Sequence, residues 1–176
     1  VDITQLSERQ LLVLRKSMGY LFQEGALYDF MTVFENVAFP LVEHTRLKEK
    51  DISVKVKTMI NEVGLEKAVF KYPAQLSGGM KKRAALARSV ILNSKFLFCD
   101  EPTSGLNPIR SRDITDLIRR MARQIHCTTV VTSHDIHNAF RLADRLVLIR
   151  QGEIVVEGTP KTLQESPDKF VREFLE

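Results

Sequence analysis

Apolar residues recur at helical intervals in the first half of the chain. A capping box formed by Ser7 and Gln10 predicts a short helix over the leucines that follow, and apolar positions from Ile52 to Val63 predict a longer helix that Gly64 ends. The other elements expected in this half are a buried strand over 18–23 and helices over 32–40 and 77–92.

From residue 96 onwards, short apolar runs alternate with helical segments. A turn at Gln151-Gly152 then leads into a last strand over 154–156 and two short helices. Continuous apolar runs joined by helices are typical of a parallel sheet covered on both faces. We therefore predict an α/β domain with a helical segment inserted in its first half. The strands expected here are 96–99, 128–132 and 146–149, with helices over 108–125 and 135–143.

Composition adds little to this picture. With 176 residues, 44% of them hydrophobic and 27% charged, the chain resembles an ordinary globular domain, and its net charge of +4 is too small to identify a partner. Cys99 and Cys127 lie in strand-like runs and are interpreted as reduced core residues of a cytosolic protein, with a disulfide or a zinc site as the alternative. No run reaches the roughly 18 apolar residues of a membrane span, so any membrane role is expected to be peripheral.

Polar residues follow three of the expected strands, at the sheet edge where ligands of parallel α/β folds bind. Asp100 would hold Mg²⁺ through water and Glu101 would orient or deprotonate an attacking water. Gln23 would touch the metal and the water, and His134 would bond a γ-phosphate. Each has a simpler alternative, because an Asp-Glu pair can end a strand in solvent and His134 can be incidental to a helix start.

A helix that opens with Ser77, Gly78 and Gly79 strengthens the catalytic interpretation. Its free N–H groups and the Ser77 hydroxyl form an anion site, since glycines let the backbone approach a ligand closely. Alone, the same residues would indicate a capped helix after a flexible hinge. A strand ending in two carboxylates shortly afterwards favours the anion site.

These motifs resemble those of the ATP-binding-cassette (ABC) ATPases. LSGGM (76–80) is similar to the family's signature, with Met80 where Gln is usual, and FLFCDE (96–101) is similar to its Walker B strand and catalytic glutamate. SGLN (104–107) resembles the D-loop, Gln23 the Q-loop glutamine and His134 the switch histidine. The resemblance implies a P-loop NTPase-like α/β fold, with ATP and Mg²⁺ as cofactors.

The resemblance also implies partners. Two ATPase subunits would sandwich two nucleotides, so that Ser77, Gly78, Gly79 and Met80 of one copy face the γ-phosphate bound by the other. The region from the Q-loop through the helical insertion would contact transmembrane permease subunits, and no nucleic acid is expected. Lys81, Lys82, Arg83 and Arg88 are interpreted as a solvated helix face in preference to a lipid site. The candidate permease contacts are Leu27, Tyr28, Phe30 and Met31.

A closer resemblance is carried by FQEGALYDFMTVFENVAFPL (22–41), EHTRL (43–47) and LSGGMKKRAALARS. These segments are similar to the Mla-type ATPases, which power phospholipid transport between the membranes of Gram-negative cells. The resemblance implies a cytoplasmic subunit peripheral to the inner membrane, with a small regulatory subunit as a further partner. Mce-type lipid importers, other ABC transporters and DNA-repair ATPases are the alternatives, although the last normally carry coiled coils and the chain shows no heptad run.

Two departures from the family pattern stand out. No G-x-x-x-x-G-K-[ST] phosphate loop occurs in the sequence, so we expect it, with the first strands of the sheet, upstream of Val1. Residues 1–176 would then be a partial ABC ATPase, inactive alone, or a non-catalytic dimerising fragment. Asn107 stands where the family has Asp; it would cap the next helix but lacks a negative charge near the partner's nucleotide. The expected divisions are a helical and signature subdomain over 24–92, a core over 93–158 and terminal helices over 159–176.

Overall fold

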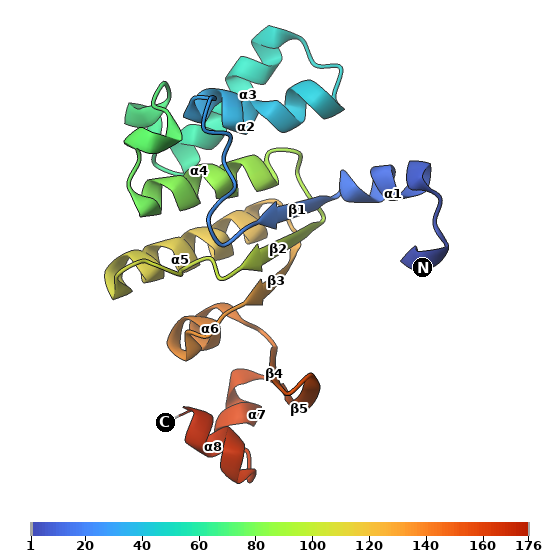
Figure 1. Ribbon diagram of the computed structural model, residues 1–176, viewed down its shortest axis with the longest axis vertical. Coiled ribbons are helices and arrows are strands. Elements are labelled where there is room, and N and C mark those ends of the chain that lie inside the picture. Colours follow the sequence, from blue (N-terminus) through green and yellow to red (C-terminus); the bar gives the residue numbers. More distant parts are fainter. Residues whose placement is uncertain (1, 176) are drawn as a thin grey trace. The chain divides into compact units, whose positions relative to one another are not determined.

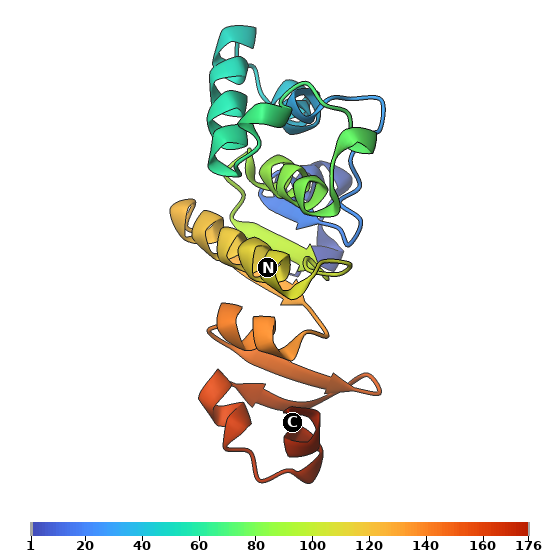
Figure 2. The ribbon, with the colours of Figure 1, turned by 90° about the vertical axis from the view of Figure 1, so that its left-hand side faces the viewer.

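The computed structural model describes residues 2–175, which form two compact units, one ending at Thr132 and one beginning at Ser133. Figures 1 and 2 show both units in two perpendicular views. None of the helices among residues 2–175 is long and apolar enough to cross a membrane. The motifs expected at Gln23, at residues 76–80 and at residues 96–107 all lie in the first unit, whereas His134 lies in the second.

The first unit is built around a three-stranded parallel sheet in the order β1-β2-β3. Its strands are β1 (Met18–Leu21), β2 (Phe96–Asp100) and β3 (Thr128–Thr132). The register places Leu21 opposite Cys99 and Asp100 opposite Thr132, so the ends of the strands lie at one edge. The parallel sheet predicted from the alternation of strands and helices is therefore confirmed.

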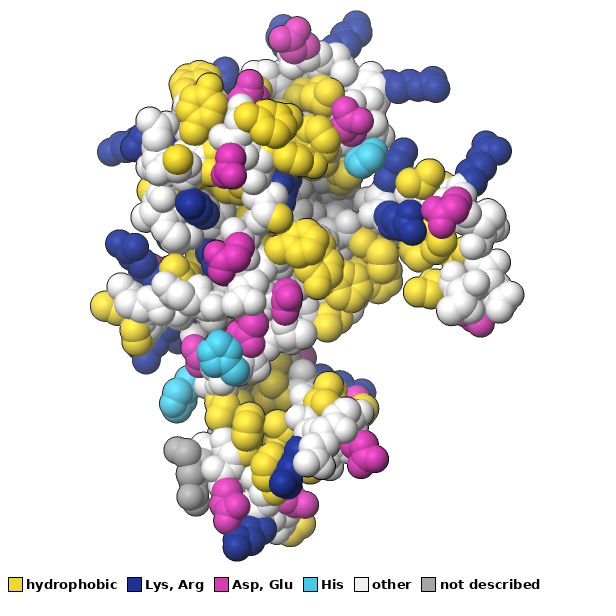
Figure 3. Space-filling model, viewed as in Figure 1, with side chains coloured by type: hydrophobic (Ala, Val, Ile, Leu, Met, Phe, Trp, Pro, Cys, Tyr) yellow, Lys and Arg dark blue, Asp and Glu magenta, His cyan; other side chains and the backbone are white. Residues whose placement is uncertain are grey.

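The two faces of this sheet differ in exposure. Side chains alternate along each strand, as the pleat requires, and one face is buried at Gly19, Leu21, Leu97 and Cys99. The opposite face exposes apolar side chains, and the ring of Tyr20 stacks on that of Phe98 with centroids 6.2 Å apart. Hydrophobic side chains gather over β1 in Figure 3. The exposed members of this face are Tyr20, Phe96 and Val130.

Two long helices bury the first face and carry the predicted motifs at their starts. In α4 (Gly78–Val90) the helix begins at the Ser77 cap, and in α5 (Pro108–Gln124) it begins at the Asn107 cap. The backbone of α4 approaches β1 so closely that a Cβ added at Gly19 would lie 2.2 Å from the carbonyl oxygen of Ser89. Glycine is needed at this position because no side chain fits.

The helical segment consists of α2 (Val33–His44), α3 (Glu49–Glu62) and the 3₁₀ turns η2 (Glu66–Ala68) and η3 (Pro73–Gln75). Thr32 and Glu35 form a capping box at the start of α2, within the segment where the sequence predicts a helix. The predicted end at Pro40 was wrong, because the helix continues to His44. Proline removes only one N–H donor, and the buried stripe through Val37 and Leu41 continues past it.

The N-terminal segment contributes η1 (Ile3–Gln5) and α1 (Glu8–Arg15) to the first unit. The expected box at the start of α1 is present, with the Ser7 backbone N–H donating to Gln10 Oε1 at 2.9 Å. This helix has no buried residue and leads directly into β1.

The second unit contains a two-stranded sheet and three helices. Leu146–Ile149 was expected to alternate with helices as a parallel strand, but β4 pairs with β5 in an antiparallel hairpin instead. The turn explains the pairing, since Gln151 and Gly152 both have positive φ (51° and 84°), the conformation of tight hairpin turns. The elements are α6 (Ile136–Leu142), β4 (Leu146–Arg150), β5 (Glu153–Gly158), α7 (Pro160–Gln164) and α8 (Lys169–Leu175).

Candidate functional site

The acidic pair lies where β2 leaves the sheet. Asp100 is the last residue of β2, and Glu101 turns away from it in a left-handed backbone conformation with φ 44°. The Glu101 N–H donates to the carbonyl oxygen of Thr132 at 3.1 Å, and the Thr132 hydroxyl donates to Asp100 Oδ1 at 2.6 Å. Thr132 therefore holds the backbone of one acidic residue and the carboxylate of the other.

Thr132 was not selected by sequence reasoning. Its importance follows from register, because Asp100 pairs with Thr132 across β2 and β3. A polar residue opposite the last residue of the Walker B strand is the signal that would have identified it, but registers are not visible in a sequence.

Gln23 lies two positions beyond the end of β1, beside the segment that follows the acidic pair. Its side-chain Nε2 donates to Ser104 Oγ at 3.2 Å. The chain bends sharply just after Gln23, since Gly25 and Ala26 both have positive φ (81° and 47°). The structure thus brings Gln23 to the loop after Asp100 and Glu101, at the common edge of neighbouring strands.

Lys82 links these two loops through its side chain. The prediction that Lys82 lies on a solvated face of α4 was wrong, because Lys82 is only 6% exposed. Its ammonium donates to the carbonyl oxygens of Gln23 and, at 3.4 Å, Glu101. Burial lowers the pKa of Lys82, while the negative charges of Glu24, Glu101 and Asp100 act in the opposite direction.

Arg83 and Arg88 also bind backbone carbonyls. Arg83 Nη1 donates to Val63 O at 3.0 Å, and Arg88 donates to Ala26 O at 2.7 Å and to Gly25 O at 2.9 Å. Burial also lowers the pKa of Arg88, whose guanidinium lies 5.7 Å from the ring centre of Tyr28. Lys82, Arg83 and Arg88 thus connect α4 to neighbouring loops.

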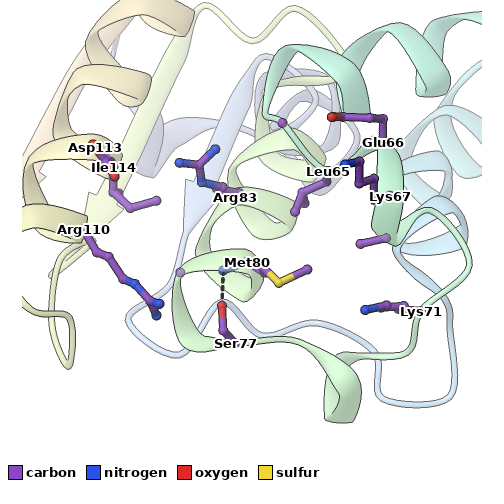
Figure 4. Close-up of a pocket in the computed structure, with 13 residues that line it drawn as sticks. Leu65, Glu66, Lys67, Lys71, Ser77, Met80, Arg83, Arg110, Asp113 and Ile114 are labelled. Carbon is purple, nitrogen blue, oxygen red and sulfur yellow. Dashed lines mark hydrogen bonds between the residues drawn. The ribbon is translucent and has the colours of Figure 1, made fainter.

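The start of α4 lines a pocket of about 340 Å³. The Ser77 hydroxyl accepts from the Met80 N–H at 3.4 Å, and a Cβ added at Gly78 would meet only the Leu106 side chain, at 3.6 Å. Figure 4 shows Met80 and Ser77 beside each other and the Arg110 side chain reaching from α5 toward them. Its charged lining residues are four cations, Lys67, Lys71, Arg83 and Arg110, and two acidic residues, Glu66 and Asp113.

Asn107 caps α5 as expected. Its Oδ1 accepts from the Arg110 N–H at 2.9 Å, and Pro108 occupies the first helical position. Since Arg110 lines the signature pocket, the cap also orients the helix that carries this cation. No charge is required for the cap itself.

His134 lies in the second unit, next to the Asp135 cap of α6. It is exposed and lines a cavity of about 470 Å³ with other residues of that unit, among them His137 and Phe140. Its predicted part in γ-phosphate binding remains a prediction.

The residues expected to serve Mg²⁺ suit an ion bound mainly by phosphate and water. Among residues 2–175, no group of three or more His, Cys, Asp or Glu side chains is arranged to hold a metal. Thr132 fixes one oxygen of Asp100, which leaves the other for a metal-bound water. Mg²⁺ retains several waters in nucleotide sites and needs only one or two protein ligands, so Asp100 and Gln23 fit this role.

Comparison with known proteins agrees with this geometry. The family model described as ABC transporter matches residues 1–104, which hold the Q-loop, the signature and the acidic pair. The chain belongs to the ABC transporter family. Among solved structures, cbiO1 of Clostridium perfringens, part of the ABC transporter complex cbiONQ, superposes with a TM-score of 0.83 at 29% identity, covering 96% of this chain and 65% of that one.

A second ABC structure is a dimer of an ATP-binding cassette in a post-hydrolysis state bound to ADP and Pi. It superposes with a TM-score of 0.80 at 27% identity, over 91% of this chain and 70% of that one. The α/β fold with its parallel sheet is therefore that of ABC ATPases, as the motifs implied.

The curated proteins similar to this chain include ATP-binding proteins of transport systems. The intermembrane phospholipid transport ATP-binding protein MlaF of Haemophilus influenzae is 42% identical over 174 residues, and MlaF of Escherichia coli K12 is 39% identical over 175. A probable ribonucleotide transport ATP-binding protein, mkl of Mycobacterium leprae, is 38% identical over 174 residues. The alignments cover 99% of this chain but only 66%, 65% and 50% of these relatives.

Proposed function

We propose that this ABC family chain is the nucleotide-binding part of an ATPase that drives phospholipid transport between the membranes of a Gram-negative cell. The observation that carries the proposal is the 42% identity to a phospholipid-transport ATP-binding protein over 174 residues. The subunit would lie at the cytoplasmic face of the inner membrane as a homodimer, with permease subunits and a small regulatory subunit.

The chemistry is hydrolysis of the γ-phosphoryl bond of ATP. Glu101 would take the proton from a water attacking the γ-phosphorus, while Gln23 orients that water and His134 binds the γ-phosphate. Mg²⁺, held through water by Asp100 and Gln23, would neutralise charge on the phosphate oxygens. The products are ADP and inorganic phosphate, and the proposal is supported by the closeness of the Gln23 and Glu101 backbones, which share the Lys82 ammonium.

The signature would act on a nucleotide bound mainly by a second copy. Ser77, Gly78 and Gly79 lie at the N-terminus of α4, where free N–H groups favour an anion, and Arg110 extends toward them. Asn107 would bring the D-loop to the same interface. The dimeric ATP-binding cassette bound to ADP and Pi supports this arrangement by fold similarity.

The permease surface is proposed at the loop after β1. Phe30 is 75% exposed and Tyr28 is 38% exposed, although Asn36 holds the backbone of Tyr28 through an N–H bond of 2.8 Å. Figure 3 shows hydrophobic side chains gathered over α2, next to this loop. A rigid loop that exposes aromatic rings suits a protein contact. Leu27 and Met31 complete this surface.

Ribonucleotide transport is the second candidate, because the mkl relative named for it is 38% identical to this chain. The experiment uses the protein as encoded, with any residues that precede Val1, reconstituted with its membrane subunits in liposomes. Phospholipid transfer driven by ATP supports the proposal. Nucleotide uptake without phospholipid transfer would instead favour ribonucleotide transport.

Glu101 is the proposed general base, and its replacement tests this role. Glu101→Gln should lower ATP turnover about a hundredfold or more, because an amide cannot accept the proton, while ATP binding persists. The measurement is phosphate release under saturating ATP. Glu153→Gln, at an exposed position of β5, is the matched control and should leave turnover unchanged. Equal turnover of Glu101→Gln and the unaltered protein would refute the assignment of the base.

A further inference from the structure

The ammonium of Lys82 joins segments that are remote in sequence. It binds the carbonyl oxygen of Gln23, 59 residues away, and that of Glu101, 19 residues away. Lys82 itself lies on the buried side of α4, five positions after Ser77. One side chain therefore touches the signature helix, the Q-loop and the turn after the Walker B strand.

Contacts with carbonyl oxygens fix the main chain and leave the side chains available for chemistry. An ammonium offers three donors, enough to hold two carbonyls at once. Glu101 needs such support because its backbone is left-handed, an unfavourable conformation for a residue with a Cβ. The side chain of Gln23 donates to Ser104. Lys82 therefore holds the backbone of Gln23 and does not engage its side chain.

Arg88 provides a second tether from the same helix. Its guanidinium holds the carbonyls of Gly25 and Ala26, where the loop after β1 bends. The fit is close here too, since a Cβ added at Gly25 would meet the Cβ of Ala85 at 3.2 Å. The loop is thus bound to α4 at two points, by Lys82 and by Arg88.

We propose that Lys82 is a positioning residue that clamps the backbones of Gln23 and Glu101 to the signature helix. Movement of α4, when its start binds a nucleotide of the opposite copy, is then passed to both loops of its own site. The catalytic part of this proposal rests on the proposed ATPase function.

The kinetic test compares three variants of the encoded protein. Lys82→Met, which removes the donors and keeps the length of the stem, should lower kcat at least about tenfold and change the KM for ATP less than about twofold. Lys82→Arg, which restores a cation, should retain activity within about threefold of the unaltered protein. Lys55→Met, at an exposed lysine of α3, is the control and should have no effect.

The second measurement does not require turnover. Amide hydrogen exchange of the segment 22–28 should be about tenfold faster in Lys82→Met and unchanged in Lys82→Arg and Lys55→Met. Should Lys82→Met fail to fold, Lys82→Gln, which keeps one amide donor, replaces it and should show a smaller change in the same direction.

The outcomes separate the two proposals. An unaltered protein that does not hydrolyse ATP contradicts the proposed function, and the exchange rates then decide the role of Lys82 alone. Active protein with normal kcat and normal exchange in Lys82→Met overturns the clamp. A raised KM with unchanged kcat also overturns it, because such a change indicates lost ground-state binding rather than lost positioning.

Discussion

Individual side chains at the site act mainly on backbone. Lys82, Arg83 and Arg88 each donate to carbonyl oxygens of a neighbouring segment, and Thr132 binds both the N–H of Glu101 and the carboxylate of Asp100. The residues named by the motifs are therefore held in place by residues that no motif names. This arrangement predicts that activity depends on the supporting groups as well as on the acidic pair.

Thr132 offers a direct test at this scale. Thr132→Val preserves the shape of the side chain but removes the hydroxyl that donates to Asp100 at 2.6 Å. We expect kcat to fall about tenfold, because a freer carboxylate positions the metal-bound water less well. Phosphate release as a function of Mg²⁺ concentration is the measurement. Thr128→Val, at the exposed first position of the same strand, should behave as the unaltered protein, and an equal loss in both variants would argue against the bond.

At the scale of elements, the close approach of α4 and β1 fixes where the signature helix lies. The contact depends on Gly19, which faces the carbonyl of Ser89 in the last turns of α4. Since the same helix carries Ser77 at its start, packing at one end sets the position of the proposed anion site at the other. The predicted caps of α1 and α5 are present in the structure, because each cap depends only on residues within one helical turn.

Gly19→Ala tests this packing. The added Cβ would lie 2.2 Å from a backbone oxygen, which cannot move aside cheaply, so the free energy of unfolding should fall by about 2 kcal/mol or more. Chemical denaturation measures the change. Gly78→Ala is the matched control, since its Cβ meets only a side chain at 3.6 Å and alanine favours a helix; its stability should be equal or slightly higher. Equal stability of the Gly19 variant and the unaltered protein would contradict the close contact.

On the scale of the whole molecule, the first unit presents two surfaces suited to partners. One is the basic pocket at the start of α4, and the other is the loop that exposes Tyr28 and Phe30. Helix α4 connects these two surfaces. Its start lines the pocket, and its Lys82 and Arg88 side chains bind the loop. Nucleotide binding and permease contact are thus expected to influence each other.

Dimerisation should report on the first of these surfaces. In the Glu101→Gln background, which preserves ATP, the encoded protein is expected to dimerise when ATP and Mg²⁺ are added. Gly78→Asp should abolish this association, since a carboxylate at the anion site repels the γ-phosphate. Sedimentation velocity measures the mass. Lys55→Asp, which places a carboxylate on the exposed surface of α3, should still dimerise; a dimer that forms equally with Gly78→Asp would refute the role of the signature.

The sequence alone determined the family, the parallel sheet and the caps, because motifs and caps are local patterns of residue type and spacing. It could not determine that Lys82 is buried, that Thr132 faces Asp100, that α2 continues past Pro40 or that β4 pairs with β5. Each of these depends on which segments meet, and the Lys82 contacts span 59 and 19 residues. A lysine on a helix is exposed or buried according to what packs against it, and only the tertiary structure supplies that neighbour.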